Sequence, residues 1–142
     1  MAVTVDVLLA IKIHKDDTKI RIANVSGDKF PAREIEIAQQ GGAEAIEIDA
    51  KVHEWSNYFK AGLKGASELL GKKRSSEFTS VGMDVLVDGS VPAGGGLSSS
   101  AAFVCASALA VMRANGEESV DKTELTELAI VSERAVGVNS GG

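Results

Sequence analysis

Several kinds of residue are scarce in this sequence, and each scarcity excludes a class of protein. One cysteine among 142 residues cannot form an internal disulfide, which excludes a small secreted domain held together by disulfides. The 15 lysines and arginines stand against 20 aspartates and glutamates, a formal net charge of −5. This balance argues against a nucleic-acid partner or an anionic membrane surface. No apolar run approaches the roughly 20 residues that cross a bilayer.

The rest of the composition is that of an ordinary globular protein. Hydrophobic residues make up 44% of the chain and charged residues 25%, and the length suits one domain with a hydrophobic core. Because no charged leader precedes an apolar signal segment, we expect a cytoplasmic protein. Prolines number only 2, whereas glycines number 15, and the positions of the glycines are the most informative feature.

The first third of the chain alternates in the manner of β-strands. Apolar residues occupy every second position from 3 to 13, which predicts a half-buried strand. The polar cluster at 14–17 predicts a turn, and the alternation resumes at 20–22 in a returning strand. An Ile-x-Ile pattern occurs twice more within 34–48, around a pair of glycines, so we expect a second hairpin there.

The period then changes to that of a helix. Aromatic and aliphatic residues recur at helical spacing over 54–70, and Gly71 stands where a helix is expected to stop. Residues 78–87 alternate again and predict a further strand.

Two helices are predicted in the last third. Residues 101–112 are apolar on all sides, which indicates a buried helix that ends at Asn115-Gly116. A last helix opens at Asp121, with Glu124 at the capping-box spacing, and runs to Gly137. We therefore predict one α+β domain, with a mixed or antiparallel sheet packed on helices.

A glycine-rich turn between a strand and a helix carries the clearest chemistry. Residues 94–96 are three glycines, and the following helix opens on three serines at 98–100. Glycines let backbone N–H groups approach oxyanions, and a helix N-terminus adds free donors and partial positive charge. The run is neither a Walker loop nor a dinucleotide fingerprint. Three glycines alone are more often a plain connection, but serines at the mouth of an apolar helix favour a phosphate site.

Three stretches resemble one family of enzymes. Residues 91–102 (VPAGGGLSSSAA) closely resemble the phosphate-binding second motif of the GHMP small-molecule kinases, and of galactokinases in particular. Residues 55–65 (WSNYFKAGLKG) are similar to the Trp-x-Asn-Tyr-x-x-Gly helix of galactokinases, and 132–142 (SERAVGVNSGG) to the segment before their catalytic Met-Asp-Gln. The resemblance covers nearly the whole chain, is closest to fungal-type galactokinases, and implies the ribosomal protein S5 domain 2-like fold of the GHMP N-terminal domain.

The resemblance implies a site for ATP and Mg²⁺. Ser99 or Ser100 would reach the magnesium, and Glu133 would complete the metal site. The residues that would surround the ATP phosphates are Gly94, Gly95, Gly96, Leu97, Ser98, Ser99 and Ser100. Helical spacing puts Glu133 at the border of an apolar face, where a carboxylate needs a cation. The alternative is a surface glutamate paired with Arg134 or Lys122.

The same resemblance assigns contacts to the adenine and the sugar. Trp55 and Tyr58, one helical turn apart, would flank the adenine, although aromatic residues at that spacing are more often core. Ser140 and Gly141 match the loop that touches the sugar, where close fungal members have asparagine in place of Ser140.

The implied reaction is transfer of the γ-phosphoryl group of ATP to the 1-hydroxyl of galactose. The family's catalytic aspartate is expected just after Gly142, and the Gly-Glu-His-x-Asp-Tyr sugar motif and the C-terminal domain of the family are absent from the chain. We therefore expect an internal fragment, residues 1–142 of a GHMP N-terminal domain truncated at both ends, that is inactive alone.

Three other functions stay open at this point. The first is a non-enzymatic galactose and ATP sensor whose partner is a transcriptional repressor, but such sensors tend to have a shortened serine-alanine run, which is intact at 98–102. The second is an N-acetylgalactosamine kinase. The third is an α+β domain that binds a nucleotide for unrelated chemistry.

Overall fold

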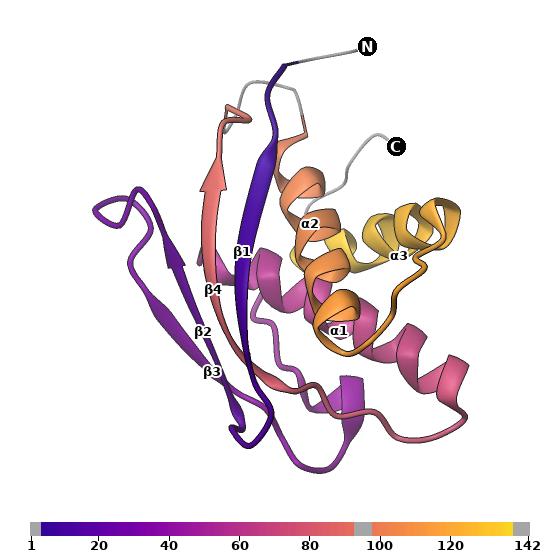
Figure 1. The fold of residues 1–142 in the computed structure, drawn as a ribbon. Helices are drawn as coiled ribbons and strands as arrows, with labels where there is room; N and C mark the ends of the chain where they lie inside the picture. Colours follow the sequence, from indigo (N-terminus) through magenta and orange to yellow (C-terminus); the bar gives the residue numbers. More distant parts are fainter. Residues whose placement is uncertain (1–3, 93–97, 138–142) are drawn as a thin grey trace.

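A four-stranded sheet and three α-helices make up residues 4–92 and 98–137, which are the residues that the computed structural model describes (Figure 1). The helices lie against one face of the sheet. The elements in chain order are β1 (Val7–His14), β2 (Lys19–Asn24), β3 (Arg33–Glu36), the 3-10 helix η1 (Gly42–Ala45), α1 (Ser56–Arg74), β4 (Gly82–Gly89), α2 (Ser99–Ala114) and α3 (Lys122–Arg134). The predicted α+β class, with a mixed sheet packed on helices, is confirmed.

The strand order in the sheet is β1-β4-β2-β3, with β4 antiparallel to β1 and parallel to β2. The first strand and the returning strand are therefore not neighbours, because β4 lies between them. Val85 of β4 has Ile11 of β1 on one side and Ile22 of β2 on the other. Because β4 lies between two strands, its buried side chains have apolar neighbours on both β1 and β2. A strand of a two-stranded hairpin has a neighbouring strand on one side only.

The second predicted hairpin is wrong. Its first half is β3, which pairs with β2 so that Ile35 lies beside Ile20. Its second half forms no strand: Gly41 and Gly42 have φ angles of 91° and 50°, and this left-handed turn leads into η1. The following Ile46 then packs against the main core instead of joining the sheet.

The end of α1 also differs from the prediction. Gly71 lies inside the helix, which continues to Arg74. Ser75 takes the left-handed position at φ 49°, and the N–H groups of Ser75 and Ser76 both donate to the carbonyl of Gly71. A serine therefore holds the capping position that glycine usually holds, and a rule based on glycine places the end too early.

The end of α2 and the start of α3 follow the sequence more closely, whereas α3 ends at Arg134, before the predicted end at Gly137. Asn115 caps α2, and Gly116 follows with φ 89°. The Asp121 side chain accepts hydrogen bonds from the N–H groups of Thr123 and Glu124, as expected for an N-cap. The expectation that α2 is buried on all sides holds only in part, because Leu109 is 39% exposed.

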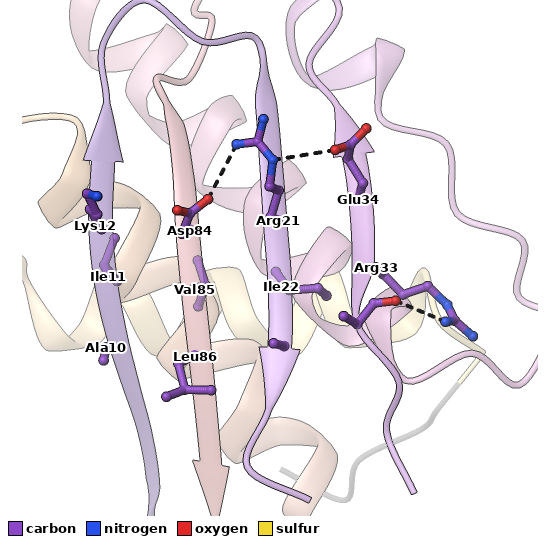
Figure 2. Close-up of a pocket in the computed structure, with 12 residues that line it drawn as sticks. Ala10, Ile11, Lys12, Arg21, Ile22, Arg33, Glu34, Asp84, Val85 and Leu86 are labelled. Carbon is purple, nitrogen blue, oxygen red and sulfur yellow. Dashed lines mark hydrogen bonds and ion pairs between the residues drawn. The ribbon is translucent and has the colours of Figure 1, made fainter. Parts of the chain in front are cut away.

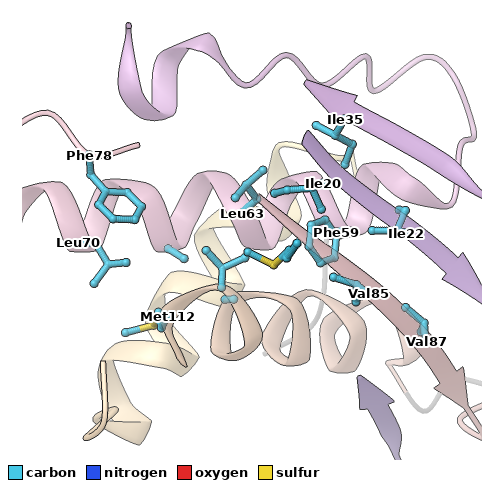
Figure 3. Packing of buried hydrophobic residues seen from close by; sticks show 14 residues of the cluster. Ile20, Ile22, Ile35, Phe59, Leu63, Leu70, Phe78, Val85, Val87 and Met112 are labelled. Atoms are coloured by element: carbon cyan, nitrogen blue, oxygen red, sulfur yellow. The ribbon is translucent and has the colours of Figure 1, made fainter. Parts of the chain in front are cut away.

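The hydrophobic core lies between the sheet and the helices (Figure 3). It is built from buried side chains of both layers, which are Ile20, Ile22, Ile35, Phe59, Leu63, Ala66, Leu70, Phe78, Met83, Val85, Val87, Ala108, Val111 and Met112. A smaller cluster of Ala61, Val104 and Ala129 joins the three helices to each other. None of the described helices is long and apolar enough to cross a membrane.

The side chain of Asn115 ties the end of α2 to the segment before β4. Its Oδ1 accepts a hydrogen bond from the Val81 N–H at 3.0 Å, and its Nδ2 donates to Ser80 Oγ at 3.0 Å and to the Val111 carbonyl at 2.8 Å. Two of these bonds, to Val81 and Ser80, connect the end of α2 to the segment that leads into β4, and the third holds the amide against its own helix.

Replacing this amide is expected to weaken the fold. Asn115→Ala leaves the part-buried Val81 N–H without its acceptor, so the free energy of unfolding should fall by about 1–3 kcal/mol in urea denaturation. The matched control is Asn24→Ala, which removes a single acceptor for the Ser26 N–H in an exposed turn and should cost about 0.5 kcal/mol. Equal losses in the two variants would contradict the proposed tie.

Candidate functional site

The serine run stands at the N-terminus of α2. Ser98 has φ 55° in the left-handed region, Ser99 is the first helical residue, and the Ser98 side chain caps no N–H group. The first N–H groups of a helix have no partners within the helix and lie at the positive end of its dipole. This terminus is therefore suited to bind an anion. Of the remaining predicted site residues, those outside the described part of the chain are Gly94, Gly95, Gly96, Leu97, Ser140 and Gly141.

Glu133 comes from the last turn of α3 and meets the first turn of α2. Its side chain is fully buried, and Ser100 Oγ donates a hydrogen bond to Glu133 Oε1 at 2.5 Å. The sequence alternative of a surface glutamate is therefore wrong. The structure brings together two of the three residues predicted to hold a metal, although they stand 33 positions apart in the sequence.

The second oxygen of this carboxylate is left without a partner by the residues that the structure describes. Within the described residues, Glu133 Oε2 is buried and accepts no hydrogen bond. Removing a carboxylate from water costs several kcal/mol unless a cation or hydrogen bonds compensate. An unpartnered oxygen at a helix N-terminus that itself attracts anions fits a cation carried by an anionic ligand.

The chemistry of these ligands fits Mg²⁺. A carboxylate and a serine hydroxyl supply hard oxygen atoms, and Mg²⁺ is commonly held by one or two carboxylates together with phosphate oxygens. The described residues contain no cluster of three or more His, Cys, Asp or Glu side chains able to hold a metal by themselves. The Ser100–Glu133 pair could therefore hold such an ion only together with ligands from outside the described residues.

Trp55 and Tyr58 both reach Phe103, which lies one turn into α2. The Trp55 and Phe103 rings stack with centroids 6.1 Å apart, and the Tyr58 ring lies 6.5 Å from Phe103 at a tilt. Trp55 also contacts Phe30 at 5.9 Å, and its Nε1 donates to the Pro31 carbonyl at 2.9 Å. The two predicted residues therefore lie beside the start of α2, and both also pack as part of the fold.

Phe103 is the member of this group that sequence reasoning missed. It follows Ser100 by three positions inside an apolar helix, so periodicity marks it only as core. The available signal was its spacing, which places it on the same side of α2 as the serine hydroxyl of Ser100.

A separate groove lies on the uncovered face of the sheet (Figure 2). It encloses about 700 Å³, and all the elements that line it are strands or the segment before β3. Arg21 pairs there with Asp84, Glu34 and Asp17. The hydrogen bond from His14, with Arg21 beside it, lowers the pKa of Asp84, and Arg21 also lowers the pKa of Asp17. These charges compensate each other on the face opposite the helices, so the groove is not part of the serine site.

The only cysteine of the chain lies close to Glu133. Cys105 is partly buried on α2, and burial raises the pKa of its thiol, with the negative charge of Glu133 as the second cause. Loss of the Glu133 charge should therefore lower the pKa of this thiol.

Known proteins match both the sequence and the fold. Residues 57–142 match the family described as GHMP kinases N terminal domain. The whole chain aligns with galactokinases of Candida parapsilosis, at 44% identity over 142 residues, and Saccharomyces cerevisiae, at 40% over 148. It spans 27% and 28% of the length of these two relatives.

Two solved structures share the fold. Lactococcus lactis galactokinase complexed with galactose superposes with a TM-score of 0.72 at 24% identity, over 97% of this chain and 32% of that one. Mevalonate kinase of Methanococcus jannaschii gives a TM-score of 0.68 at 16% identity, over 92% of this chain and 37% of that one. The arrangement of strands and helices is therefore one that sugar and mevalonate kinases contain.

The coupling between Cys105 and Glu133 gives a test of the site. Glu133→Gln removes the negative charge, so the pKa of Cys105 should fall and its alkylation by iodoacetamide at pH 8.5 should accelerate roughly two- to fivefold, because the thiolate is the reacting form. Glu127→Gln, on an exposed position of the same helix, should leave the rate unchanged. The same rate in Glu133→Gln and the unmodified chain would show that the carboxylate is not charged beside the thiol.

Proposed function

The chain belongs to the GHMP kinase family, and we propose that it forms the phosphate- and metal-binding part of a galactokinase, which transfers the γ-phosphoryl group of ATP to the 1-hydroxyl of galactose. Relatives that are named galactokinase align with the whole length of this chain, and they support this reaction. The observation that carries the proposal is the buried Glu133 carboxylate at the N-terminus of α2. One of its oxygens is bonded to Ser100, and the other has no partner in the part of the chain that the structure describes.

Phosphoryl transfer depends mostly on positioning and charge neutralisation, and the described residues are arranged for both. The free N–H groups at the start of α2 would hold phosphate oxygens, with Gly94, Gly95, Gly96 and Leu97 around them. The Ser100 hydroxyl donates a hydrogen bond to Glu133, so the lone pairs of its oxygen remain free to bind a metal ion.

Glu133 and a serine of the run, Ser99 or Ser100, would hold Mg²⁺ together with the nucleotide. The bound ion supplies neutralisation of the negative charge on the transferring group. Burial of Glu133 keeps its carboxylate away from water and fixed in direction, so it needs little reorganisation during the reaction.

The base and the sugar contact other residues in this proposal. Trp55 and Tyr58, both against Phe103 beside the first turns of α2, would flank the adenine. Ser140 and Gly141 would contact galactose. No residue of the chain is assigned to deprotonate the sugar hydroxyl. The intact serine-alanine run at 98–102 favours the kinase over a galactose sensor.

A chimaera tests the proposal in a complete enzyme. This chain replaces the matching segment of Candida parapsilosis galactokinase, to which it aligns over all 142 residues. The chimaera should phosphorylate galactose with Mg-ATP, and Glu133→Gln within it should lower kcat/KM by roughly 100-fold or more, as expected for loss of a fixed charge-stabilising group. Phosphate transfer is followed by coupled ADP detection with galactose and with N-acetylgalactosamine.

Two controls accompany the chimaera. Glu127→Gln should retain full activity, and the 142-residue chain alone should phosphorylate neither sugar. A folded chimaera that binds galactose and Mg-ATP without turnover would indicate a sensor, and preference for N-acetylgalactosamine would indicate that kinase instead. Full activity in Glu133→Gln would exclude the proposed metal site.

A further inference from the structure

Helix α1 packs directly against the backbone of α2. The crossing lies at Gly62, where a Cβ atom would come within 2.8 Å of both the Ala108 nitrogen and the Val104 carbonyl oxygen. Backbone atoms cannot rotate out of the way, so any side chain at this position would move α2. Val104 is one helical turn after Ser100, and this contact therefore fixes the part of α2 that carries the serine.

The same helix packs against α3 three residues later. A Cβ atom at Gly65 would lie 2.3 Å from Ser132 Oγ and 2.6 Å from Leu128 Cδ2. Ser132 directly precedes Glu133, and both side chains are buried. The contact at Gly65 therefore fixes the turn of α3 that carries the carboxylate.

Neither glycine is required by the backbone. The glycines with positive φ are Gly41, Gly42, Gly116 and Gly137 among the described residues, so Gly62 and Gly65 have ordinary helical conformation. Glycine in a helix interior is unfavourable relative to alanine. These two positions gain a close approach of α2 and α3, because a methyl group would meet the backbone of α2 at Gly62 and the side chains of Ser132 and Leu128 at Gly65.

We propose that Gly62 and Gly65 are positioning residues for the Ser100–Glu133 pair, and through it for the cation that the nucleotide brings. Gly62 sets how closely α2 approaches α1, and Gly65 sets how closely α3 approaches it. Together they set the distance between the Ser100 and Glu133 side chains. That separation is a single hydrogen bond of 2.5 Å, and Mg²⁺ requires ligand distances near 2.0–2.1 Å. A displacement of a few tenths of an ångström is therefore enough to disturb the site. This inference rests on the proposed function.

Binding of Mn²⁺–ATP by the galactokinase chimaera described above, which carries the chain in a complete enzyme, tests the inference without measuring catalysis. Mn²⁺ replaces Mg²⁺, and its environment is followed by the relaxation of water protons. Gly65→Ala should raise the dissociation constant at least tenfold at a temperature where the variant is folded by circular dichroism. Gly65→Ala with Ser132→Ala, which removes the oxygen nearest to the new methyl group but leaves Leu128 Cδ2 at 2.6 Å, should recover part of the affinity.

Two controls separate positioning from general stability. Gly71→Ala adds the same methyl group to the same helix, where the nearest atom, the Ser76 carbonyl oxygen, is 3.3 Å away, and should bind as the unmodified chimaera does. Leu70→Val perturbs the core of α1 away from the crossing and should lower stability without changing affinity. If Gly65→Ala does not fold, Ser132→Thr adds a methyl group from the α3 side of the contact and should weaken binding at least threefold.

The outcomes distinguish this inference from the proposed function. Normal affinity in Gly65→Ala, or in Ser132→Thr where that variant is the one measured, together with lost affinity in Glu133→Gln, would overturn the positioning role and leave the metal site standing. Equal affinity in Glu133→Gln and the unmodified chimaera, or no binding by the unmodified chimaera, would overturn both. A loss in Leu70→Val as large as that in Gly65→Ala would reduce the glycine effect to stability and overturn the positioning role.

Discussion

A carboxylate that is removed from water needs compensation, and among the described residues Glu133 accepts only one hydrogen bond, from Ser100. All three helices contribute to the Ser100–Glu133 pair. α2 supplies the hydroxyl and a helix N-terminus, α3 supplies the carboxylate, and α1 lies against both with glycines at its crossings. The sheet supports α1 and α2 through the core. The fold thus holds a buried carboxylate beside a helix N-terminus, and in our proposal a cation joins this carboxylate to the phosphates of the nucleotide.

The sequence predicted those parts of the fold that depend on nearby residues. The cap at Asp121 and the end of α2 at Asn115-Gly116 are local signals, and both were correct. The place of β4 between β1 and β2 was not predictable, because it depends on contacts of Val85 with residues more than 60 positions away. The early end assigned to α1 at Gly71 failed because a serine, Ser75, takes the left-handed capping conformation in place of a glycine. The second hairpin failed because Gly41 and Gly42 both have positive φ and turn the chain into η1.

The sequence predicted the candidate site only in part. The serines were found from glycine and serine spacing, whereas Glu133 was assigned by family resemblance, since helical spacing alone allowed a surface position. Its complete burial and its bond to Ser100 are tertiary facts. The contact of Phe103 with both Trp55 and Tyr58 was missed for the same reason, because an apolar helix does not show in its sequence which of its residues contact the aromatic side chains of another element.

The most direct test of a cation at Glu133 is anomalous diffraction from a crystal of the chain grown with Mn²⁺ and a non-hydrolysable ATP analogue. A manganese peak is expected at coordination distance from the Glu133 carboxylate, with a hydroxyl of Ser99 or Ser100 as a second protein ligand and phosphate oxygens as further ligands. A manganese ion on the phosphates but away from Glu133, with that carboxylate still bonded only to Ser100, would contradict the site.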